Sequence, residues 1–485
     1  MNADSAQLDP ALRDREVGSF AIDSREVIAG GLFFALSQPE YTENGFNGDF
    51  DDSTRYVPSA LSQGAVACVV RPERYEEHRE LLEPFRSRLL FANDVIAAFQ
   101  RLAHGVYREW NKPVVAITGS AGKTTAKELT AHVLAAGGKK VLRNIKNYNN
   151  GLGHPLTVLN LAKDPTYDVA VLEMGMSTPL NEIARLCRIT PPDVAVELNV
   201  LPVHLEHLGS IEGIARAKAE LIEGMKPGGV AVLNADDPRV MAMSELSRGS
   251  VLSYGIESRA DVRAEQIKFE CFGETTFVLS IKGEEAEVSF PLNGKHNILN
   301  GLAAAAVAST FGMNAAQIAA GLSTVEAPQQ RGEILHFAEG FTVINDSYNS
   351  NPDALISMVQ TLVDGGGPRR KIVVAGEMLE LGPDAAEIHR RTGKRLAELG
   401  IDVLIGVRGF GRELVEGARS AGVSEVRFAE DSSVAGDALC EMVVGGDVVL
   451  VKGSRGVRTE NVIAKLMEKF HLEKANSKST EAVTG

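Results

Sequence analysis

The residues that most clearly indicate chemistry lie within positions 113–130, PVVAITGSAGKTTAKELT. An apolar run ends in a turn of small residues, after which a helix-like pattern begins. In such a turn, main-chain N–H groups and a lysine hold phosphates, and a hydroxyl holds Mg²⁺. The generic motif G-x-x-x-x-G-K-[ST] is matched imperfectly, because Ile117 stands where its first glycine would be. We expect a nucleotide site rather than an ordinary strand–helix turn, formed by Gly119, Ser120, Ala121, Gly122, Lys123, Thr124 and Thr125.

A carboxylate stands at the end of a second buried-looking strand, at residues 168–173. Ligands bind at the carboxyl ends of strands in open α/β sheets, so Glu173 is placed to bind Mg²⁺, and a solvated strand end is the alternative. His204 and His207 lack a third ligand at zinc spacing, which leaves one histidine near the metal and phosphates as the functional interpretation. Lys218 lies in a helical pattern over 212–225, and that pattern alone favours a surface position.

Other segments contain side chains that are able to contact ligands. Residues 147–156, NYNNGLGHPL, suit a ligand-binding loop and an ordinary turn equally well. Residues 346–352 and 452–456 each follow a strand-like run, which is a favoured position for a ligand contact. Asn297 precedes an alanine-rich helix, and capping of that helix is its alternative role. Turn chemistry explains Asp23-Ser24-Arg25 better than an anion contact does.

The composition restricts the class of partner. The 485 residues include 50 basic and 64 acidic side chains, and the resulting net charge of −14 argues against nucleic-acid or anionic-membrane partners. We expect a cytoplasmic protein without membrane insertion, since the sequence shows no signal-peptide pattern and no apolar run of about 20 residues. The four cysteines are far apart and are expected to be reduced: Cys68, Cys187, Cys271 and Cys440.

The patterns of strands and helices predict an α/β protein of three domains. Residues 1–108 form a small α/β domain, in which 41–56 is predicted to be a long loop. Residues 109–326 alternate strands and helices, which predicts a central parallel sheet, and 262–290 predict a small antiparallel insert. Residues 327–470 predict a doubly wound, Rossmann-like sheet, and 471–485 a disordered tail.

Taken in chain order, these motifs resemble those of the Mur ligases, the ATP-dependent amide-forming enzymes of peptidoglycan precursor synthesis. The resemblance covers nearly the whole chain and is carried by TGSAGKTT, NYNNGLGHPL, EMG at 173–175, N-x4-HLE at 199–206, GKHNILN and DSYNSNP. EMG followed by NEIARL is similar to the branch that adds D-alanyl-D-alanine to UDP-N-acetylmuramoyl-tripeptide. The branch that adds diaminopimelate or lysine is the alternative.

The resemblance implies roles for the matched residues. Lys123, Lys218 and His204 would be catalytic, and Thr124, Glu173, His204 and Lys218 would bind the two Mg²⁺ ions. Lys218 looks like the lysine that family members carbamylate, which overrides the surface position that its pattern favours. The implied nucleotide contacts from later in the chain are Asn297, Arg331 and Asp346. The implied substrate contacts are Ser24, Arg25, Asn149, Asn150, Tyr348, Asn349 and Asn351.

The implied reaction forms an amide bond through an acyl phosphate, with ATP, the UDP-linked tripeptide and the dipeptide as partners of a monomeric enzyme. A nucleotide-dependent switch or motor is disfavoured because the sequence contains no N-K-x-D guanine motif, and the intact lysines and acids argue against a non-catalytic binding protein. Two features depart from the family pattern. His154 stands where a small apolar residue is usual, and residues 41–56 replace a short Gly-Asp-Gly-like segment. Whether the tripeptide ends in lysine or diaminopimelate stays open.

Overall fold

The computed structural model describes residues 8–46, 50–145, 147–176, 181–202 and 210–473. Its contacts separate two units. The first comprises Met1–Val200, His207–Val262 and Ala303–Met313, and the second comprises Leu201–Glu206, Arg263–Leu302 and Asn314–Gly485. Among the described helices, none has both the length and the apolar character that crossing a membrane requires. The three cysteines whose side chains are described are buried and form no disulfide: Cys68, Cys187 and Cys440.

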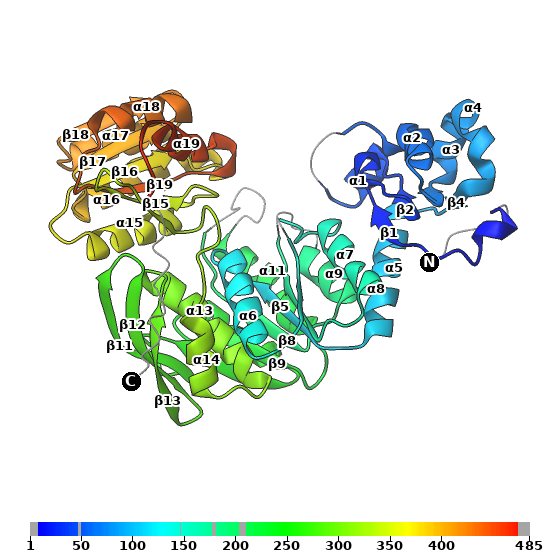
Figure 1. Ribbon diagram of the computed structural model, residues 1–485, viewed down its shortest axis with the longest axis horizontal. Helices are drawn as coiled ribbons and strands as arrows, with labels where there is room; N and C mark the ends of the chain where they lie inside the picture. Colours follow the sequence, from blue (N-terminus) through cyan, green and yellow to red (C-terminus); the bar gives the residue numbers. More distant parts are fainter. Residues whose placement is uncertain (1–7, 47–49, 146, 177–180, 203–209, 474–485) are drawn as a thin grey trace, which may run out of the picture. The chain divides into compact units, whose positions relative to one another are not determined.

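The first unit begins with a small parallel sheet in the order β1-β2-β3-β4 (Figure 1). Its strands are β1 (Ser19–Ala21), β2 (Gly31–Phe34), β3 (Ala67–Val70) and β4 (Leu89–Phe91). The short helices around it are α1 (Gln38–Glu43), α2 (Val57–Ser62), α3 (Pro72–Glu77) and α4 (Arg79–Leu82). Strands β2 and β3 are buried throughout, which explains their continuous apolar sequences.

The loop predicted at residues 41–56 is only partly present. The helix α1 runs on to Glu43, and a 3₁₀ turn occupies Ser53–Tyr56. Residues 47–49 lie outside the described part of the chain. The prediction missed α1 because its six residues are too few to show a helical period. Its start has a physical cause, since Pro39 lies in the first turn, where its fixed φ suits a helix and its missing N–H is not needed.

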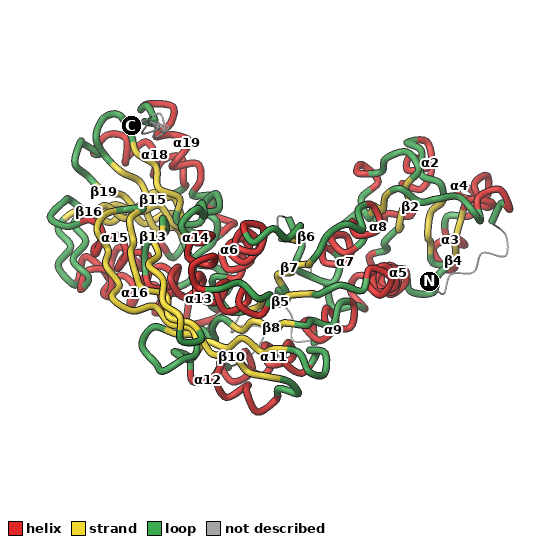
Figure 2. Tube along the Cα trace, turned by 60° about the horizontal axis from the view of Figure 1, so that its bottom comes forward, coloured by secondary structure: helices red, strands yellow, loops and turns green. Residues whose placement is uncertain are grey.

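Six parallel strands form the central sheet of the first unit, in the order β10-β9-β8-β5-β7-β6. In Figure 2 the labels of β10, β8, β5, β7 and β6 follow one another in this order. They are β5 (Val114–Thr118), β6 (Val141–Arg143), β7 (Val169–Glu173), β8 (Val194–Glu197), β9 (Val230–Asn234) and β10 (Ser250–Gly255). The helices that accompany them are α5 (Val95–Trp110), α6 (Lys123–Ala136), α7 (Gly153–Val158), α8 (Asn160–Lys163), α9 (Glu182–Ile189), α11 (Ile211–Glu223) and α12 (Pro238–Ala242). The predicted parallel sheet is therefore confirmed.

The second unit contains the predicted insert and a six-stranded sheet. The insert strands are β11 (Val262–Cys271), β12 (Glu274–Ile281) and β13 (Glu284–Phe290), and β12 pairs with β13 antiparallel. Helices α13 (Lys295–Thr310) and α14 (Ala315–Leu322) follow. The order of the six-stranded sheet is β14-β15-β19-β16-β17-β18, in which β14 alone is antiparallel to its neighbour.

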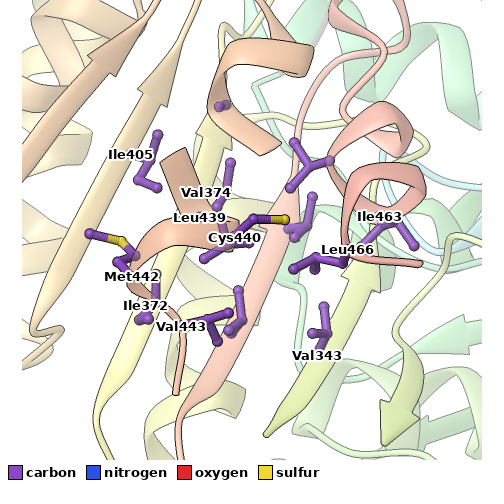
Figure 3. Close-up of a cluster of buried hydrophobic side chains, with 14 of the residues drawn as sticks. Val343, Ile372, Val374, Ile405, Leu439, Cys440, Met442, Val443, Ile463 and Leu466 are labelled. Atoms are coloured by element: carbon purple, nitrogen blue, oxygen red, sulfur yellow. The ribbon is translucent and has the colours of Figure 1, made fainter. Parts of the chain in front are cut away.

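The strands of that sheet are β14 (Glu333–His336), β15 (Thr342–Asp346), β16 (Lys371–Gly376), β17 (Val403–Val407), β18 (Glu425–Ala429) and β19 (Val448–Lys452). Its helices are α15 (Pro352–Gly366), α16 (Ala385–Glu398), α17 (Gly411–Ser420), α18 (Ser432–Met442) and α19 (Glu460–Lys469). Figure 3 shows one of its cores, where apolar side chains of the strands meet those of α18 and α19. A second core includes side chains of α15, α16 and α17. The sheet is thus covered on both faces, as a doubly wound fold requires.

Candidate active site

The predicted phosphate loop connects the end of β5 to the first residue of α6. All five residues of β5 are buried, and Gly122 precedes the helix with a φ of 84°, a conformation that side chains other than glycine rarely adopt. Gly119 also has no room for a side chain, because a Cβ there would lie 2.8 Å from the Cβ of Leu198. The loop therefore directs main-chain N–H groups to the start of α6, where the helix dipole attracts anions.

Asn199, two residues past the end of the neighbouring strand β8, holds this loop in place. Its Oδ1 accepts from the N–H of Ala121 at 2.9 Å, and its Nδ2 donates to the carbonyl of Ala121 at 3.1 Å. The carbonyl oxygen of Asn199 also accepts from the N–H of Ser120 at 3.0 Å. Lys123 donates from Nζ to the carbonyl of Gly119 at 2.8 Å, so its ammonium group lies over the loop. The predicted loop residues are thus assembled around one ammonium group.

Thr124 and Glu173 meet beside the loop. The hydroxyl of Thr124 donates to Oε2 of Glu173 at 2.9 Å, and Asn149 donates from Nδ2 to Oε1 at 2.8 Å. The side chain of Asn144 holds the main chain of Glu173. Its Oδ1 accepts from the N–H of Glu173, and its Nδ2 donates to the carbonyl oxygen of Glu173, both at 3.0 Å. A hydroxyl and a carboxylate in contact beside a phosphate loop form an oxygen pair of the kind that Mg²⁺ prefers.

Asn150 has a local role in the structure. Its Oδ1 accepts from the N–H groups of Leu152 at 3.1 Å and Gly153 at 2.9 Å, just where α7 begins. Of the two asparagines of this segment that were predicted to contact substrate, Asn149 therefore points at Glu173 and Asn150 shapes its own turn. His154, the neighbouring departure from the family pattern, is fully buried, and its Nε2 lies 2.7 Å from the hydroxyl of Thr190. Burial lowers the pKa of His154 to about 3.

Lys218 is buried in the structure, with 2% of its surface exposed. The surface position favoured by its sequence pattern is therefore wrong, and the reason is that Lys218 lies on the stripe of α11 that also buries Ile214, Leu221 and Ile222. Burial and the charge of Lys123 lower the pKa of the Lys218 ammonium to about 7, although Glu197 acts in the opposite direction. At neutral pH a large fraction of Lys218 is thus an uncharged amine.

Glu197, the last residue of β8, is fully buried near the two lysines. Burial raises the pKa of its carboxyl to about 8, against the opposing charges of Lys218 and Lys123. The sequence signal for this residue was a single acid inside the apolar run DVAVELN. His204, the remaining predicted metal ligand, lies outside the described residues. Among the described residues, no three His, Cys, Asp or Glu side chains form a group that could hold a metal ion.

Ser24 and Arg25 lie in a 3₁₀ turn after β1. The side chain of Asp23 accepts from the main-chain N–H of Arg25 at 2.9 Å, as the turn interpretation expects. The guanidinium of Arg25 is 87% exposed and pairs with the same aspartate at 2.6 Å, which holds the pKa of Asp23 below its usual value. These contacts of Asp23 and Arg25 are thus local to the turn.

The second unit holds the other predicted nucleotide contacts. Asn297 is buried in the first turn of α13, where its Nδ2 donates to the carbonyl of Asn293 at 2.8 Å. The adjacent His296 lies with Nδ1 3.1 Å from the hydroxyl of Ser357, and burial lowers its pKa to about 4. The negative charge of Asp346 acts in the opposite direction and raises the pKa of His296.

The carboxyl end of β15 brings several predicted ligand contacts together. Asp346 forms an ion pair with Lys452 at the end of β19, and Lys452 also donates to the carbonyl of Asn349 at 2.8 Å. The guanidinium of Arg331 lies 4.0 Å from the centre of the Tyr348 ring, so the cation rests on the face of the ring. Asn351 has a clear structural role, because its Oδ1 accepts from the N–H of Ala354 and caps α15.

Comparison with known proteins connects these features. The model of the Mur ligase middle domain matches residues 117–308, and that of the Mur ligase glutamate ligase domain matches residues 330–455. The UDP-N-acetylmuramoyl-tripeptide–D-alanyl-D-alanine ligase of Mycobacterium tuberculosis is 35% identical over 488 aligned positions, which cover 93% of this chain and 92% of that protein. The chain belongs to the Mur ligase family.

Two solved structures share the fold of this Mur ligase over nearly its whole length. A crystal structure of MurF from Acinetobacter baumannii is 28% identical, covers 94% of both chains and superposes with a TM-score of 0.81. MurF from Thermotoga maritima, in complex with ADP, is 27% identical, covers 94% of this chain and 99% of that one, and has a TM-score of 0.80. The three-domain α/β architecture is therefore confirmed.

Three asparagine or acidic residues of this Mur ligase were not singled out as site residues by sequence reasoning: Asn144, Glu197 and Asn199. Asn144 and Asn199 act on main-chain groups of residues far along the chain, so neither forms a local pattern. A general signal was available for Glu197 and Asn199, since both stand at or just past the carboxyl end of a strand beside the phosphate loop.

Proposed function

We propose that this Mur ligase joins D-alanyl-D-alanine to UDP-N-acetylmuramoyl-tripeptide while ATP is cleaved to ADP and phosphate. The match that carries the proposal is the Mycobacterium tuberculosis ligase, whose name states this reaction and which aligns with 93% of the chain. The geometry supports it independently, because Lys123 lies against the carbonyl of Gly119 and Thr124 contacts Glu173, so the three side chains would form the phosphate-binding half of an ATP site. Nucleotide binding is also supported by the ADP complex of the Thermotoga maritima relative.

In the proposed first step, a carboxylate oxygen of the tripeptide attacks the γ-phosphorus of ATP, and the bond from that phosphorus to ADP breaks. In the second, the amine of the dipeptide attacks the acyl carbon, phosphate leaves and the amine loses a proton. Two anions must meet in the first step. Lys123 and the N–H groups at the start of α6 would reduce their repulsion, so positioning and charge stabilisation supply the catalysis without a covalent nucleophile.

The residues beside the loop fit Mg²⁺. Thr124 and one oxygen of Glu173 would bind an ion there, while Asn149 fixes the other oxygen of the carboxylate. His204 and Lys218 are proposed as further ligands because they match the family motif. Bound Mg²⁺ supplies positive charge that neutralises the phosphates of ATP.

Carbamylation of Lys218 is part of the proposal. The reaction needs a neutral amine, and the lowered pKa of Lys218 makes that form abundant at neutral pH. The Nζ lone pair attacks the carbon of CO₂, a C–N bond forms and an N–H proton leaves to solvent, which turns a cation into a carboxylate-like ligand. A ¹³C NMR signal from protein incubated with ¹³C-bicarbonate, absent in Lys218→Ala, is the expected result. Equal signals in both proteins would contradict it.

The substrate contacts are also assigned by the match to family motifs. Ser24 and Arg25 would bind the uridine diphosphate, with Asn150 shaping a loop near the tripeptide. The nucleotide contacts of the second unit would be Asn297, Arg331 and Asp346, and the dipeptide contacts Tyr348, Asn349 and Asn351. The corresponding domains are residues 1–108, 109–326 and 327–470. We propose a cytoplasmic location, since ATP and a UDP-linked precursor are cytoplasmic substrates. We also propose that the protein is a monomer, which sedimentation equilibrium tests.

Release of ADP with a panel of amines tests the reaction. With UDP-N-acetylmuramoyl-tripeptide and ATP, D-alanyl-D-alanine should stimulate release, while diaminopimelate and lysine should not. Release that is stimulated by diaminopimelate or lysine with UDP-N-acetylmuramoyl-dipeptide, and not by D-alanyl-D-alanine, would assign the chain to the diamino-acid-adding branch instead. Tripeptides that end in lysine and in diaminopimelate, compared at equal concentration, show which third residue is preferred.

A further inference from the structure

Arg408, at the carboxyl edge of the six-stranded sheet of the second unit, has an unusual backbone and an unpaired charge. It directly follows β17 with a φ of 62°, a left-handed conformation that side chains other than those of asparagine and aspartate seldom adopt. Its side chain is exposed and has no carboxylate partner among the described residues. Backbone strain of this kind gathers at functional sites, and ligands bind at the carboxyl ends of parallel strands. Arg408 is therefore a candidate for contact with an anionic ligand.

The loop after β19 fixes the position of this guanidinium. Nη1 of Arg408 donates to the carbonyl oxygen of Gly456 at 2.8 Å, although the two residues are 48 positions apart. Nε and Nη2 have no acceptor among the described residues, and together they form the fork that binds a carboxylate with two hydrogen bonds. Because the guanidinium is already held, it loses little freedom when such a ligand binds.

Other cations of this edge differ from Arg408. Lys452 and Arg455 each pair with a carboxylate, at the end of β15 and at Glu460. Arg458 shares with Arg408 an exposed side chain and a left-handed backbone, with a φ of 58°. No hydrogen bond holds the guanidinium of Arg458 within the part of the chain that the structure describes. Arg408 thus combines a fixed position with a charge that lacks a carboxylate partner.

Apolar side chains are exposed beside this guanidinium. Leu379, three residues past the end of β16, is 40% exposed, and Phe410 is 41% exposed. Strands β16 and β17 are neighbours, so the loops that contain these two residues leave the same edge of the sheet. A Cβ on Gly456 would lie 2.9 Å from Cδ1 of Leu379, and the carbonyl of the same glycine accepts from Arg408. Gly456 therefore brings an apolar side chain and the guanidinium to one place.

The same place adjoins the segment that is proposed to contact the dipeptide. The hydroxyl of Ser454, which is buried, accepts from the N–H of Leu379 at 3.0 Å and donates to the carbonyl of Ser350 at 3.3 Å. The guanidinium of Arg455, next to Gly456, lies 5.7 Å from the centre of the Tyr348 ring. The loops after β15, β16, β17 and β19 thus meet around one exposed, positively charged and partly apolar surface.

We propose that Arg408 binds the C-terminal carboxylate of the incoming dipeptide, and that Leu379 and Phe410 contact its methyl groups. D-Alanyl-D-alanine has one carboxylate and two methyl side chains, which match the charge and the apolar surface of this edge. The inference rests on the proposed function, because that function supplies the dipeptide. It adds a charged contact from the loop after β17 to the contacts proposed from the loop after β15.

D-Alanyl-D-alanine and its C-terminal amide test the contact, because the amide has the same methyl groups but no negative charge. With UDP-N-acetylmuramoyl-tripeptide and ATP, the wild type should use the acid with a kcat/KM at least about tenfold higher than the amide. Arg408→Asn removes the charge but tolerates the left-handed backbone. It should lower kcat/KM for the acid by about tenfold or more and leave that for the amide unchanged.

Two further variants sharpen the result. Arg458→Asn is the matched control, since it removes an exposed arginine with the same backbone conformation from the same edge, and it should keep the wild-type kcat/KM for both dipeptides. Leu379→Ala should lower kcat/KM for the acid and the amide alike by about threefold, because it removes apolar contact without touching the charge. An unchanged Leu379→Ala would overturn the apolar contact.

The outcomes separate this inference from the proposed function. A wild type that uses the acid and the amide equally, or an Arg408→Asn variant with an unchanged kcat/KM for the acid, would overturn the role of Arg408. Equal losses with the acid and the amide in Arg408→Asn would also overturn it, because they would indicate a structural role. A wild type that releases no ADP with either dipeptide would instead overturn the proposed function. Circular dichroism and ADP binding establish that the variants are folded, and Arg408→Gln is measured in the same way if Arg408→Asn does not fold.

Discussion

Both parallel sheets place a lysine at their carboxyl edge, and the two lysines are held in different ways. Lys123 begins α6 and donates to a carbonyl oxygen of its own loop at 2.8 Å. Lys452 ends β19, where its side chain is 5% exposed and pairs with the carboxylate of Asp346. A carbonyl oxygen is a weak competitor for an ammonium group, whereas a buried carboxylate is a strong one. We therefore predict that Lys123 can turn to a phosphate, and that Lys452 acts as part of the framework.

The largest effect should follow removal of the charge of Lys123. Lys123→Met keeps most of the side-chain volume but leaves the meeting of two anions without its fixed cation, so we expect kcat to fall by about a thousandfold. ADP release under saturating substrates measures it. Lys112→Met is the matched control, since Lys112 donates to the carbonyl groups of Pro165 and Tyr167 and lies before β5, at the opposite end of that strand from the loop. Equal losses in both variants would contradict the role given to Lys123.

Lys452→Met should act on stability more than on the chemical step. It would leave Asp346 as a largely buried charge without its partner, which costs about 3 kcal/mol in the free energy of unfolding. Urea denaturation measures the cost, and a double-mutant cycle with Asp346→Asn isolates the pair. If Lys452→Met unfolds like the wild type but loses ADP affinity, then Lys452 is a ligand-binding residue and the contrast with Lys123 fails.

The same two regions show what the sequence could predict. The strand, turn and helix at residues 113–130, the strand that ends at Glu173 and the parallel sheets were predicted correctly, because each is marked by runs of neighbouring residues. Lys218 was assigned to the surface by its pattern although it shares a stripe with Ile214, four residues before it, and Leu221, three residues after it, a spacing that indicates a buried face. Counting that spacing, rather than assuming that a lysine is solvated, would have placed it correctly.

Contacts between residues far apart in the chain could not be predicted. Asn199 holds a loop 78 positions earlier, and Asn144 holds the main chain of Glu173, 29 positions later. Their partners are main-chain groups, which carry no mark in the sequence. The burial of the Glu197 carboxylate, which has no hydrogen-bond partner among the described residues, is likewise a property of the packed sheet.

Two buried histidines extend the comparison to pH. His154 in the first unit and His296 in the second have their pKa values lowered by burial to about 3 and about 4. The unfolded chain takes up these protons near pH 6.5, so between that pH and about 4 it binds more protons than the folded protein. Stability should therefore fall as the pH falls through this window, by at most about 1.4 kcal/mol per pH unit for each histidine.

Urea denaturation at several pH values, with His154→Gln, checks this effect. The variant should lose part of the slope below pH 6.5, because glutamine does not titrate. His296→Gln should remove a similar part of the slope, since burial also lowers the pKa of that ring. A slope that is the same in the wild type and His154→Gln would show that His154 is protonated in the folded protein.

The smallest effect distinguishes a structural from a ligand-binding asparagine at the edge of the second sheet. Asn351 caps α15 by accepting from the N–H of Ala354 at 2.9 Å, so Asn351→Ala should lower the free energy of unfolding by about 1 kcal/mol. Asn351→Ser retains an oxygen that can cap the helix but lacks the amide N–H groups that the asparagine offers a ligand. If Asn351 only caps, Asn351→Ser keeps both stability and the KM for D-alanyl-D-alanine. If it also binds the dipeptide, that KM rises while stability is kept, and this edge then contains a ligand contact as well as the Lys452–Asp346 framework.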